Sequence, residues 1–308
     1  MELIILGNGF DRNHDDFPSS YRHYRDFLNQ RPDYRHLIKI MERYIPILLS
    51  KQTEQQFIWA NFEEALGEMD FKFLMEELFS MYAVEYEEKT AADFSERELQ
   101  VELSKFTKDL IRSFVQWIQF IEKKVDTLAA KDFPMIHNRN LFLTFNYTKL
   151  LKKIYGIHAQ RICHIHGTIE NPKSVVFDHR NREQVDKAIA NSKTSRYLYS
   201  RQLEQMAQHF YRDTYKNCEK QIEKNLDFFR QINAAQIETV YVIGHSLSPL
   251  DGLYFEYLLS LLPSHSLWKI YIYYDHEAEK HQEKKRIRQY FSKRGVESKR
   301  ISFIDYPN

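Results

Sequence analysis

The first eleven residues constrain the fold more than any other stretch of this chain. Leu3 to Leu6 are four consecutive apolar residues, a run typical of a short strand buried on both faces. Gly7 and Gly9 follow directly, and glycine allows both a sharp turn and the close approach of a ligand to the backbone. A strand that runs into Gly-x-Gly and then a helix is the usual phosphate-binding entrance of an α/β fold. The sequence therefore predicts a parallel sheet with a ligand site at its carboxyl edge.

This first loop departs from the standard dinucleotide fingerprint. The third glycine of that pattern would stand three residues after Gly9, where the chain has Arg12, and Asp11 precedes it. A turn that serves structure alone is an open alternative for the same residues. If the loop binds a ligand, the candidate contacts are Gly7, Asn8, Gly9 and Phe10.

Composition argues against several classes of protein. The 308 residues include 44 Lys and Arg and 43 Asp and Glu, which gives a formal charge of +1. The chain as a whole therefore has no strong positive potential that would attract nucleic acid. No apolar run approaches the ~20 residues that span a bilayer, and the chain starts with a strand, so we expect no membrane segment or signal peptide. Cys163 and Cys218 form no Cys-x-x-Cys pair, which suits a reducing cytoplasm and excludes a four-cysteine zinc ribbon.

Six further apolar stretches predict the other strands of one sheet. They cover residues 141–145, 161–167, 174–177, 239–243, 268–274 and 300–304. Two long stretches with mostly helical periodicity interrupt them, at about residues 33–132 and 180–233. No internal repeat or low-complexity linker separates these parts. We therefore expect one α/β domain over residues 1–308, a Rossmann-like parallel sheet with large helical insertions.

Polar side chains stand at the ends of two of these predicted strands. Asn146 follows the first of them, and its amide can hold a water or a carboxamide, although it could also cap the next helix. His166, beside Gly167, suits a general base near neutral pH. His164 shares a face with His166, but no further ligand at metal-binding spacing is apparent, so no metal is expected. His14, in the first loop, is predicted to be solvated rather than a ligand contact.

The loop after residue 243 allows a second interpretation. Its residues Gly244-His245-Ser246-Leu247-Ser248 resemble the nucleophile elbow G-x-S-x-G of serine hydrolases, although Ser248 stands in place of the last glycine. Asp275 and His281 follow in the order that such a triad needs. A serine hydrolase of the α/β-hydrolase type that uses Ser246 is therefore an alternative.

Four motifs together resemble the AbiH family of bacterial phage-resistance, or abortive infection, proteins. They are Gly7-Asn8-Gly9-Phe10-Asp11, Thr144-Phe145-Asn146-Tyr147-Thr148, His164-Ile165-His166-Gly167, and Gly244-His245-Ser246-Leu247-Ser248 with Asp251. They occur in the expected order over nearly the whole chain. Trp59 to Glu63 and Arg212-Asp213-Thr214 resemble two further family positions, the latter with arginine where the family usually has lysine. The resemblance implies a cytoplasmic antiphage protein that responds to a phage-derived trigger.

More distantly, the same loop order resembles the sirtuin, or SIR2-like, NAD-binding fold. That similarity implies NAD or a related nucleotide as ligand or substrate, with Asn146 and His166 as catalytic residues and Gly244 and Ser246 at the nucleotide. The chain lacks the four-cysteine zinc module of deacetylating sirtuins, and Asp178 stands where their strand ends in glycine. These departures favour a reduced NAD hydrolase over a protein deacetylase.

The chemistry implied by this resemblance is cleavage of the nicotinamide–ribose bond without a metal. The transition state resembles an oxocarbenium ion, and Asp11 would contact the ribose or stabilise the developing cation. Asn146 would position a water, and His166 would take a proton. Gly167, His245 and Asp251 would complete the binding site. A non-catalytic nucleotide-binding sensor is the third alternative, and self-association into a homo-oligomer is left open.

Overall fold

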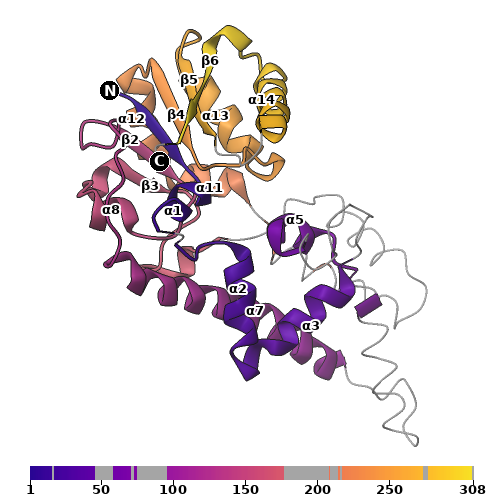
Figure 1. The fold of residues 1–308 in the computed structure, drawn as a ribbon. Coiled ribbons are helices and arrows are strands. Elements are labelled where there is room, and N and C mark those ends of the chain that lie inside the picture. Colours follow the sequence, from indigo (N-terminus) through magenta and orange to yellow (C-terminus); the bar gives the residue numbers. More distant parts are fainter. Residues whose placement is uncertain are drawn as a thin grey trace, which may run out of the picture. The chain divides into compact units, whose positions relative to one another are not determined.

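Six parallel strands form one sheet in the order β3-β2-β1-β4-β5-β6 (Figure 1). The computed structural model describes residues 1–15, 17–45, 58–70, 73–74, 96–176, 208, 214–215, 217–272 and 277–306. The strands are β1 (Leu3–Leu6), β2 (Leu141–Thr144), β3 (Ile162–His164), β4 (Thr239–Ile243), β5 (Leu267–Ile272) and β6 (Ile301–Asp305). This is the strand order of doubly wound dinucleotide-binding sheets, so the predicted Rossmann-like α/β fold is confirmed.

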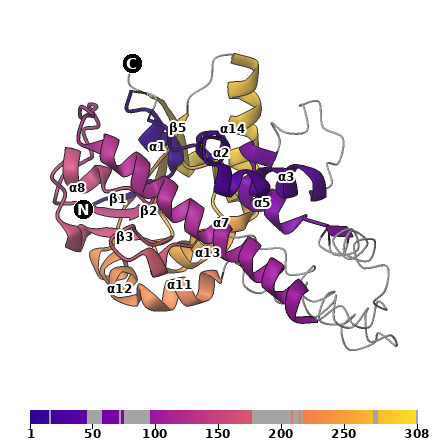
Figure 2. The same cartoon turned by 90° about the horizontal axis from the view of Figure 1, so that it is seen from below.

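The chain divides into two compact units. Unit 1 contains the sheet and comprises Met1–Ser19, Ile118–Val176 and Asn217–Asn308, and unit 2 comprises Ser20–Trp117 and Phe177–Lys216. The described helices of unit 2 are α2 (Tyr21–Asn29), α3 (Arg35–Tyr44) and α5 (Phe62–Gly67), with the short η1 (Pro32–Tyr34). The boundary between the units falls within the long helix α7 (Glu96–Val125), drawn as one continuous helix in Figure 2. Unit 2 thus starts at Ser20, whereas the sequence predicted that the helical insertion begins at about residue 33.

Helices cover both faces of the sheet in unit 1. They are α1 (Asn8–Arg12), the end of α7, α8 (Leu150–Ile154), α11 (Cys218–Lys224), α12 (Leu226–Ala235), α13 (Gly252–Leu261) and α14 (Glu277–Ser292), with the short turns η2 (Ala159–Arg161), η4 (Pro249–Asp251) and η5 (Ser298–Arg300). Figure 2 shows the end of α7 on one side of β1 to β3, and α11 and α12 on the other. No helix in the described part of the chain combines the length and apolarity needed to cross a membrane.

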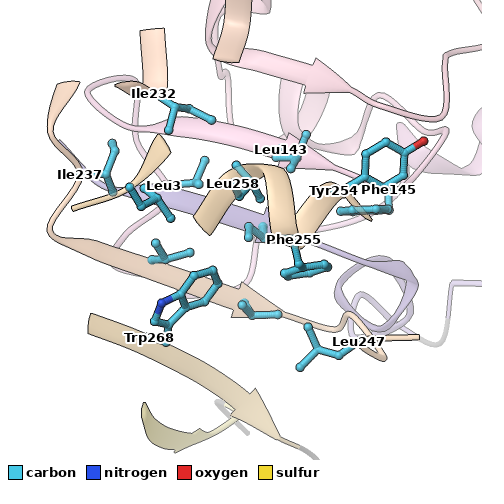
Figure 3. Packing of buried hydrophobic residues seen from close by; sticks show 14 of the residues in the cluster. Leu3, Leu143, Phe145, Ile232, Ile237, Leu247, Tyr254, Phe255, Leu258 and Trp268 are labelled. Atoms are coloured by element: carbon cyan, nitrogen blue, oxygen red, sulfur yellow. The ribbon is translucent and has the colours of Figure 1, made fainter. Parts of the chain in front are cut away.

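The main core lies between the sheet and helices α11 to α14. Alternate residues of a strand point to opposite faces, so Leu3 and Leu143 reach this core together with Trp268 (Figure 3). Ile4 and Phe142 point to the opposite face and are fully buried as well. Both faces of the central strands are therefore covered, as parallel sheets require. This burial explains why the strands are continuous apolar runs rather than alternating patterns.

The prediction of a strand over residues 174–177 is wrong for residues 174–176, which are the ones that the structure describes. Pro172–Ser174 form a single 3-10 turn, η3, and Val176 joins no strand of the sheet. Gly167 reverses the chain after β3 with φ +83°, and a Cβ on it would lie 2.1 Å from the carbonyl oxygen of Ser174. The segment therefore folds back onto the loop after β3, where the Val176 amide donates to the carbonyl of His166 (2.9 Å). Residues 177–179 lie outside the described part of the chain.

Candidate functional site

The loops after β1 and β4 are in direct backbone contact at the carboxyl edge of the sheet. The Gly7 amide donates to the carbonyl of Ile243 (3.0 Å), and the Gly9 amide donates to that of Gly244 (2.8 Å). A Cβ on Gly9 would lie 2.7 Å from Gly244 Cα, and one on Gly244 would lie 2.0 Å from the nitrogen of Phe10. The glycines therefore allow two polypeptide backbones to touch, since no side chain fits between them.

This contact limits what the first loop can offer to a phosphate. Two amides that the sequence predicted to face a ligand are already used: that of Gly7 donates to the last residue of β4, and that of Gly9 donates to the loop after β4. The Phe10 amide donates to the carbonyl of Gly7 (2.9 Å). Within the described residues, the amide of Asn8 has no such acceptor. Its side-chain Oδ1 accepts a hydrogen bond from the hydroxyl of Ser19. Asn8 is thus the residue of this loop that keeps a backbone donor for a ligand.

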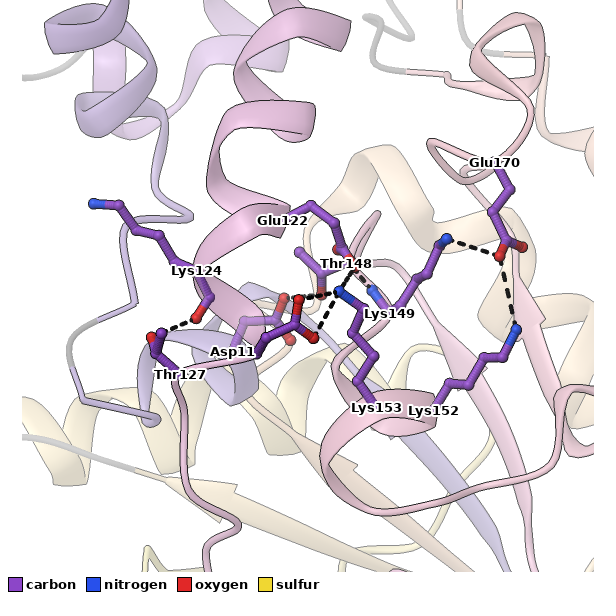
Figure 4. Close-up of polar contacts among 10 residues, drawn as sticks. Asp11, Glu122, Lys124, Thr127, Thr148, Lys149, Lys152, Lys153 and Glu170 are labelled. Carbon is purple, nitrogen blue, oxygen red and sulfur yellow. Dashed lines mark hydrogen bonds and ion pairs between the residues drawn. The ribbon is translucent and has the colours of Figure 1, made fainter.

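Asp11, Asn146 and Thr148 form a buried cluster beside α1. They are 2%, 7% and 5% exposed. The Asn146 Nδ2 donates to Asp11 Oδ1 (2.7 Å) and to the carbonyl of Gly7 (2.9 Å), and the Thr148 hydroxyl donates to Asp11 Oδ2 (2.6 Å). Figure 4 shows Thr148 against the Asp11 carboxylate. The Asn146 amide thus uses one donor on Asp11 and the other on the backbone of Gly7, while its Oδ1 accepts no hydrogen bond from the described residues.

The protonation of Asp11 is unusual. Its burial raises the pKa from 3.8 to about 7, the hydrogen bonds from Thr148 and Asn146 oppose that rise, and the nearby charge of Glu122 adds to it. Glu122, near the end of α7, is itself buried and accepts a hydrogen bond from the Lys149 amide (3.0 Å; Figure 4). At neutral pH Asp11 therefore exists both with and without a proton, which is the property of a group that can take part in acid–base chemistry.

His166, His245 and Asp251 form a second buried cluster, on the side of α13. The Asp251 Oδ1 lies 3.5 Å from His166 Nε2, and its Oδ2 lies 3.4 Å from His245 Nε2. The ring of Phe145 packs edge-on against both imidazoles, with ring centroids 5.0 Å from His166 and 4.2 Å from His245. Asp251 thus places one carboxylate between two histidines.

The two clusters lie on opposite sides of the segment that follows β2. Phe145 points to the histidines, whereas the next residue, Asn146, points to Asp11. The side chain of His164, in β3, donates from Nδ1 to the backbone carbonyl of Asn146 (3.0 Å). The structure therefore brings Asp11 together with Asn146, and His166 together with His245 and Asp251.

Two further candidate residues lie in loops beside these clusters. Gly167 lies in the turn after β3, and Ser246 is exposed in the loop after β4.

The prediction that His14 is solvated is wrong. The residue is fully buried instead. Its Nδ1 donates to the carbonyl of Phe10 (2.9 Å), and its Nε2 lies 2.7 Å from the hydroxyl of Tyr155. Burial lowers the pKa of His14, so the neutral ring is favoured. This histidine therefore fixes the end of α1 against α8 and is part of the scaffold.

The loop after β4 lacks the geometry of a nucleophile elbow. That elbow holds its serine in a strained conformation directly between a strand and a helix. The described residues with positive φ in this loop are Gly244 and Leu247, not Ser246, and helix α13 begins only at Gly252. The other two members of the proposed triad give no support, because Asp275 lies outside the described residues and His281 is an exposed residue of α14.

We therefore expect a fluorophosphonate probe to leave Ser246 unlabelled. The serine lacks the strained backbone of an elbow, and the triad histidine proposed for it, His281, is an exposed residue of α14. The measurement is mass spectrometry of the peptide that contains Ser246 after incubation of the folded protein with the probe. Stoichiometric labelling that is lost in Ser246→Ala would contradict this expectation and restore the serine hydrolase alternative.

Some expected site residues lie outside the described part of the chain. They are Asp178, Arg212 and Asp213. Among the described residues, no group of three or more His, Cys, Asp or Glu side chains is arranged to hold a metal ion. Sequence reasoning did not select Glu122, since nothing in the acidic pattern of its helix distinguishes it. Thr148 belongs to one of the recognised motifs and could have been found as the hydroxyl two residues after Asn146.

Comparison with known proteins identifies the family. A family model described as Bacteriophage abortive infection AbiH matches residues 3–273, a span that includes all four loops described above. No curated protein and no solved structure gives a significant match. Because the family model covers more than half of its length, the chain belongs to the AbiH family, whose role is abortive infection in defence against bacteriophage.

Proposed function

We propose that this AbiH protein binds NAD or a related dinucleotide and cleaves its nicotinamide–ribose bond. The observation that carries the proposal is Asp11, a buried carboxyl group with a pKa raised to about 7 that is held by Asn146 and Thr148. It follows β1, and the strand order reverses between β1 and β4. Open α/β sheets bind nucleotides outside the carboxyl ends of their strands at such a reversal.

The reaction needs a negative group beside the ribose as the bond breaks. Nicotinamide leaves as a neutral molecule with the electron pair of the bond, and positive charge develops on the ribose. An ionised Asp11, already oriented by Asn146 and Thr148, stabilises that charge without having to reorganise. The cationic nicotinamide also favours the ionised carboxyl, because a nearby positive charge lowers a carboxyl pKa.

A water then adds to the ribose carbon and gives up a proton. His166 is the proton acceptor in this proposal, since a histidine titrates near neutral pH. The products are ADP-ribose, nicotinamide and one proton. Asn8, with its backbone donor, and the exposed Ser246 are the proposed contacts of the dinucleotide.

The test is NAD turnover by the purified protein, followed as release of nicotinamide and ADP-ribose with and without phage components. We expect Asp11→Asn and His166→Ala each to lower the rate by about 10²–10⁴-fold, the usual contribution of such groups. Asn146→Ala should also lower it, because Asp11 loses its orienting donor. His265→Ala is the matched control, since this exposed histidine precedes β5 at the opposite edge of the sheet.

Two outcomes would contradict the proposal in different ways. If the wild type and all variants consume NAD at the same negligible rate in every condition, the proposed cleavage is wrong. If ADP-ribose binds to the wild type and binding is weakened by Asn8→Pro, which removes the backbone amide, but no turnover occurs, the protein is a nucleotide sensor instead.

A further inference from the structure

We infer that Glu122 is a positioning residue for Asp11. Its carboxylate holds the backbone of residues 146–149, and this segment carries the two side chains that donate to the Asp11 carboxylate. This role rests on the proposed function of Asp11, whose carboxylate has to keep its place as positive charge develops on the ribose.

The segment over residues 146–149 is held at both ends. At its start, the Asn146 amide donates to the hydroxyl of Thr144 (3.1 Å), and the Asn146 carbonyl accepts from His164 Nδ1 (3.0 Å). These partners belong to β2 and β3, so the sheet fixes this end. At the far end, the Lys149 amide donates to Glu122 Oε2 (3.0 Å; Figure 4). Glu122 therefore fixes the far end by a contact from a different helix.

Glu122 binds the start of α8 at two points one turn apart. It is buried, and besides the Lys149 amide it contacts the ammonium group of Lys153, which lies 3.2 Å from Oε1. The Lys149 side chain has no lone pair with which to cap the helix, and it pairs with Glu170 instead (2.8 Å). In a capping box, a glutamate of the same helix accepts from the amide of the capping residue. Here the glutamate comes from α7, so it ties α8 to α7 directly beside Thr148.

The two carboxylates differ in the charges around them. Glu122 faces Lys153, which also pairs with Asp126 (2.9 Å). Asp11 accepts its hydrogen bonds from an amide and a hydroxyl, which are neutral groups. Within the described part of the chain no cationic side chain pairs with Asp11, so a positive charge on a ligand would be the group that compensates it.

Glu122 also acts on Asp11 through its charge. Burial is the main reason that the pKa of Asp11 is raised to about 7, and the charge of Glu122 adds to the rise. The other titratable groups described around Asp11 are His14, whose pKa is lowered by burial, and Tyr155, whose pKa is raised to about 12 mainly by burial. Both are neutral at pH 7, so Glu122 is the charged neighbour that acts there.

The direct test is NMR of protein with labelled asparagine and aspartate, because it needs no NAD turnover. The side-chain amide signals of Asn146 are assigned with Asn146→Ala, and the carboxyl signal of Asp11 with Asp11→Asn. We expect Glu122→Ala to move the Asn146 signals, because the segment loses its second anchor. Glu122→Gln should leave them near their wild-type positions, since the glutamine oxygen can still accept from the Lys149 amide.

The same NMR experiment separates the charge of Glu122 from its hydrogen bond. In Glu122→Gln the Asp11 carboxyl should titrate at lower pH than in the wild type, because a nearby negative charge is gone. Asp126→Asn is the matched control. This carboxylate also pairs with Lys153, but it is 65% exposed, so its loss should leave the signals of Asn146 and Asp11 unchanged.

A second readout is the kinetics of NAD cleavage. In Glu122→Ala we expect the rate constant kcat to fall about tenfold or more with KM changed less than about twofold, because Asp11 loses its orientation while the dinucleotide keeps its contacts. Glu122→Gln should recover most of this loss, since it retains the hydrogen bond. The acidic limb of its kcat/KM profile should lie at lower pH than that of the wild type, because Asp11 stays ionised there.

The NMR results separate this inference from the proposed function. If the wild type does not cleave NAD but the Asn146 and Asp11 signals respond as described, the positioning role stands and the cleavage proposal fails. If the protein cleaves NAD and a folded Glu122→Ala leaves the Asn146 signals unchanged, the positioning role is wrong and the cleavage proposal stands. Should Glu122→Ala fail to fold, Glu122→Gln decides, and an unchanged titration of Asp11 would overturn the role.

Discussion

Gly244→Ala is expected to lower the free energy of unfolding by about 4 kcal/mol or more, an effect that single substitutions rarely reach. Gly244 has φ +67°, and a Cβ there would lie 2.0 Å from the nitrogen of Phe10 and 2.4 Å from the carbonyl carbon of Gly9. These are backbone atoms, which cannot rotate out of the way as a side chain can. The loops after β1 and β4 would have to separate, and the Gly9-to-Gly244 hydrogen bond would be lost. Urea unfolding followed by circular dichroism measures the change.

Gly156→Ala is the matched control for this prediction. Gly156 has nearly the same backbone conformation, φ +64°, but no atom lies within 4 Å of the Cβ position. Its substitution should cost only the backbone strain, about 1–2 kcal/mol. Equal losses in Gly156→Ala and Gly244→Ala would refute the steric account. If Gly244→Ala instead folded normally and lost only nucleotide binding, the glycine would serve the ligand and not the contact between the loops.

The strands could be predicted because their signals are local. The apolar runs that became β1 and β4 are bounded by glycine or polar residues. The prediction for residues 174–177 failed in its described part because Val175 and Val176 have strand propensity but pair with no strand of the sheet. The burial of His14 depends on Tyr155, which lies far away along the chain, so no local pattern could show it.

The candidate site was predictable only in part. Parallel strands end at one edge of a sheet, so the rule that selected Asn146 and His166 correctly placed both at the carboxyl ends of β2 and β3. It could not show that Asn146 would hold Asp11 while Phe145, one residue earlier, would pack on His166. That division follows from the alternation of side chains along an extended chain, and it depends on where each strand ends. Glu122 was missed because its contact with Lys149 joins a helix to a distant loop.

Asp11→Asn is expected to gain stability relative to the wild type as the pH rises. The free energy of unfolding of the variant minus that of the wild type should be up to about 4 kcal/mol larger above about pH 7 than near pH 4. The carboxyl has a pKa of 3.8 as its ordinary value and about 7 in the folded protein, because burial disfavours its charge. One pKa unit corresponds to ~1.36 kcal/mol, which gives the upper limit. Asparagine resembles the protonated carboxyl: its oxygen can accept from Asn146, and its NH2 can donate to the Thr148 oxygen.

The sign of this pH dependence follows from which state of the chain, folded or unfolded, binds the proton of Asp11. Below about pH 4 the folded and unfolded wild-type chains are both protonated at Asp11, and the group contributes nothing to the pH dependence. Between about pH 4 and 7 the unfolded chain has lost the proton and the folded one retains it, so stability falls as the pH rises. Above about pH 7 both are ionised, and the loss remains constant.

Urea unfolding of both proteins from pH 4 to 8 tests this, with all other groups cancelling in the difference between them. The matched control is Asp227→Asn, whose exposed side chain should give a difference that is flat across the same range. If the free energies of unfolding of Asp11→Asn and the wild type change with pH in the same way, the carboxyl of Asp11 is not buried as the structure describes. The proposed role of Asp11 beside the ribose would then lose its support. A difference that grows with pH would instead show that the fold keeps, at the end of β1, a charged group that destabilises the empty protein. Such a cost is expected where a site is built to hold a cation, because a bound positive charge would offset it.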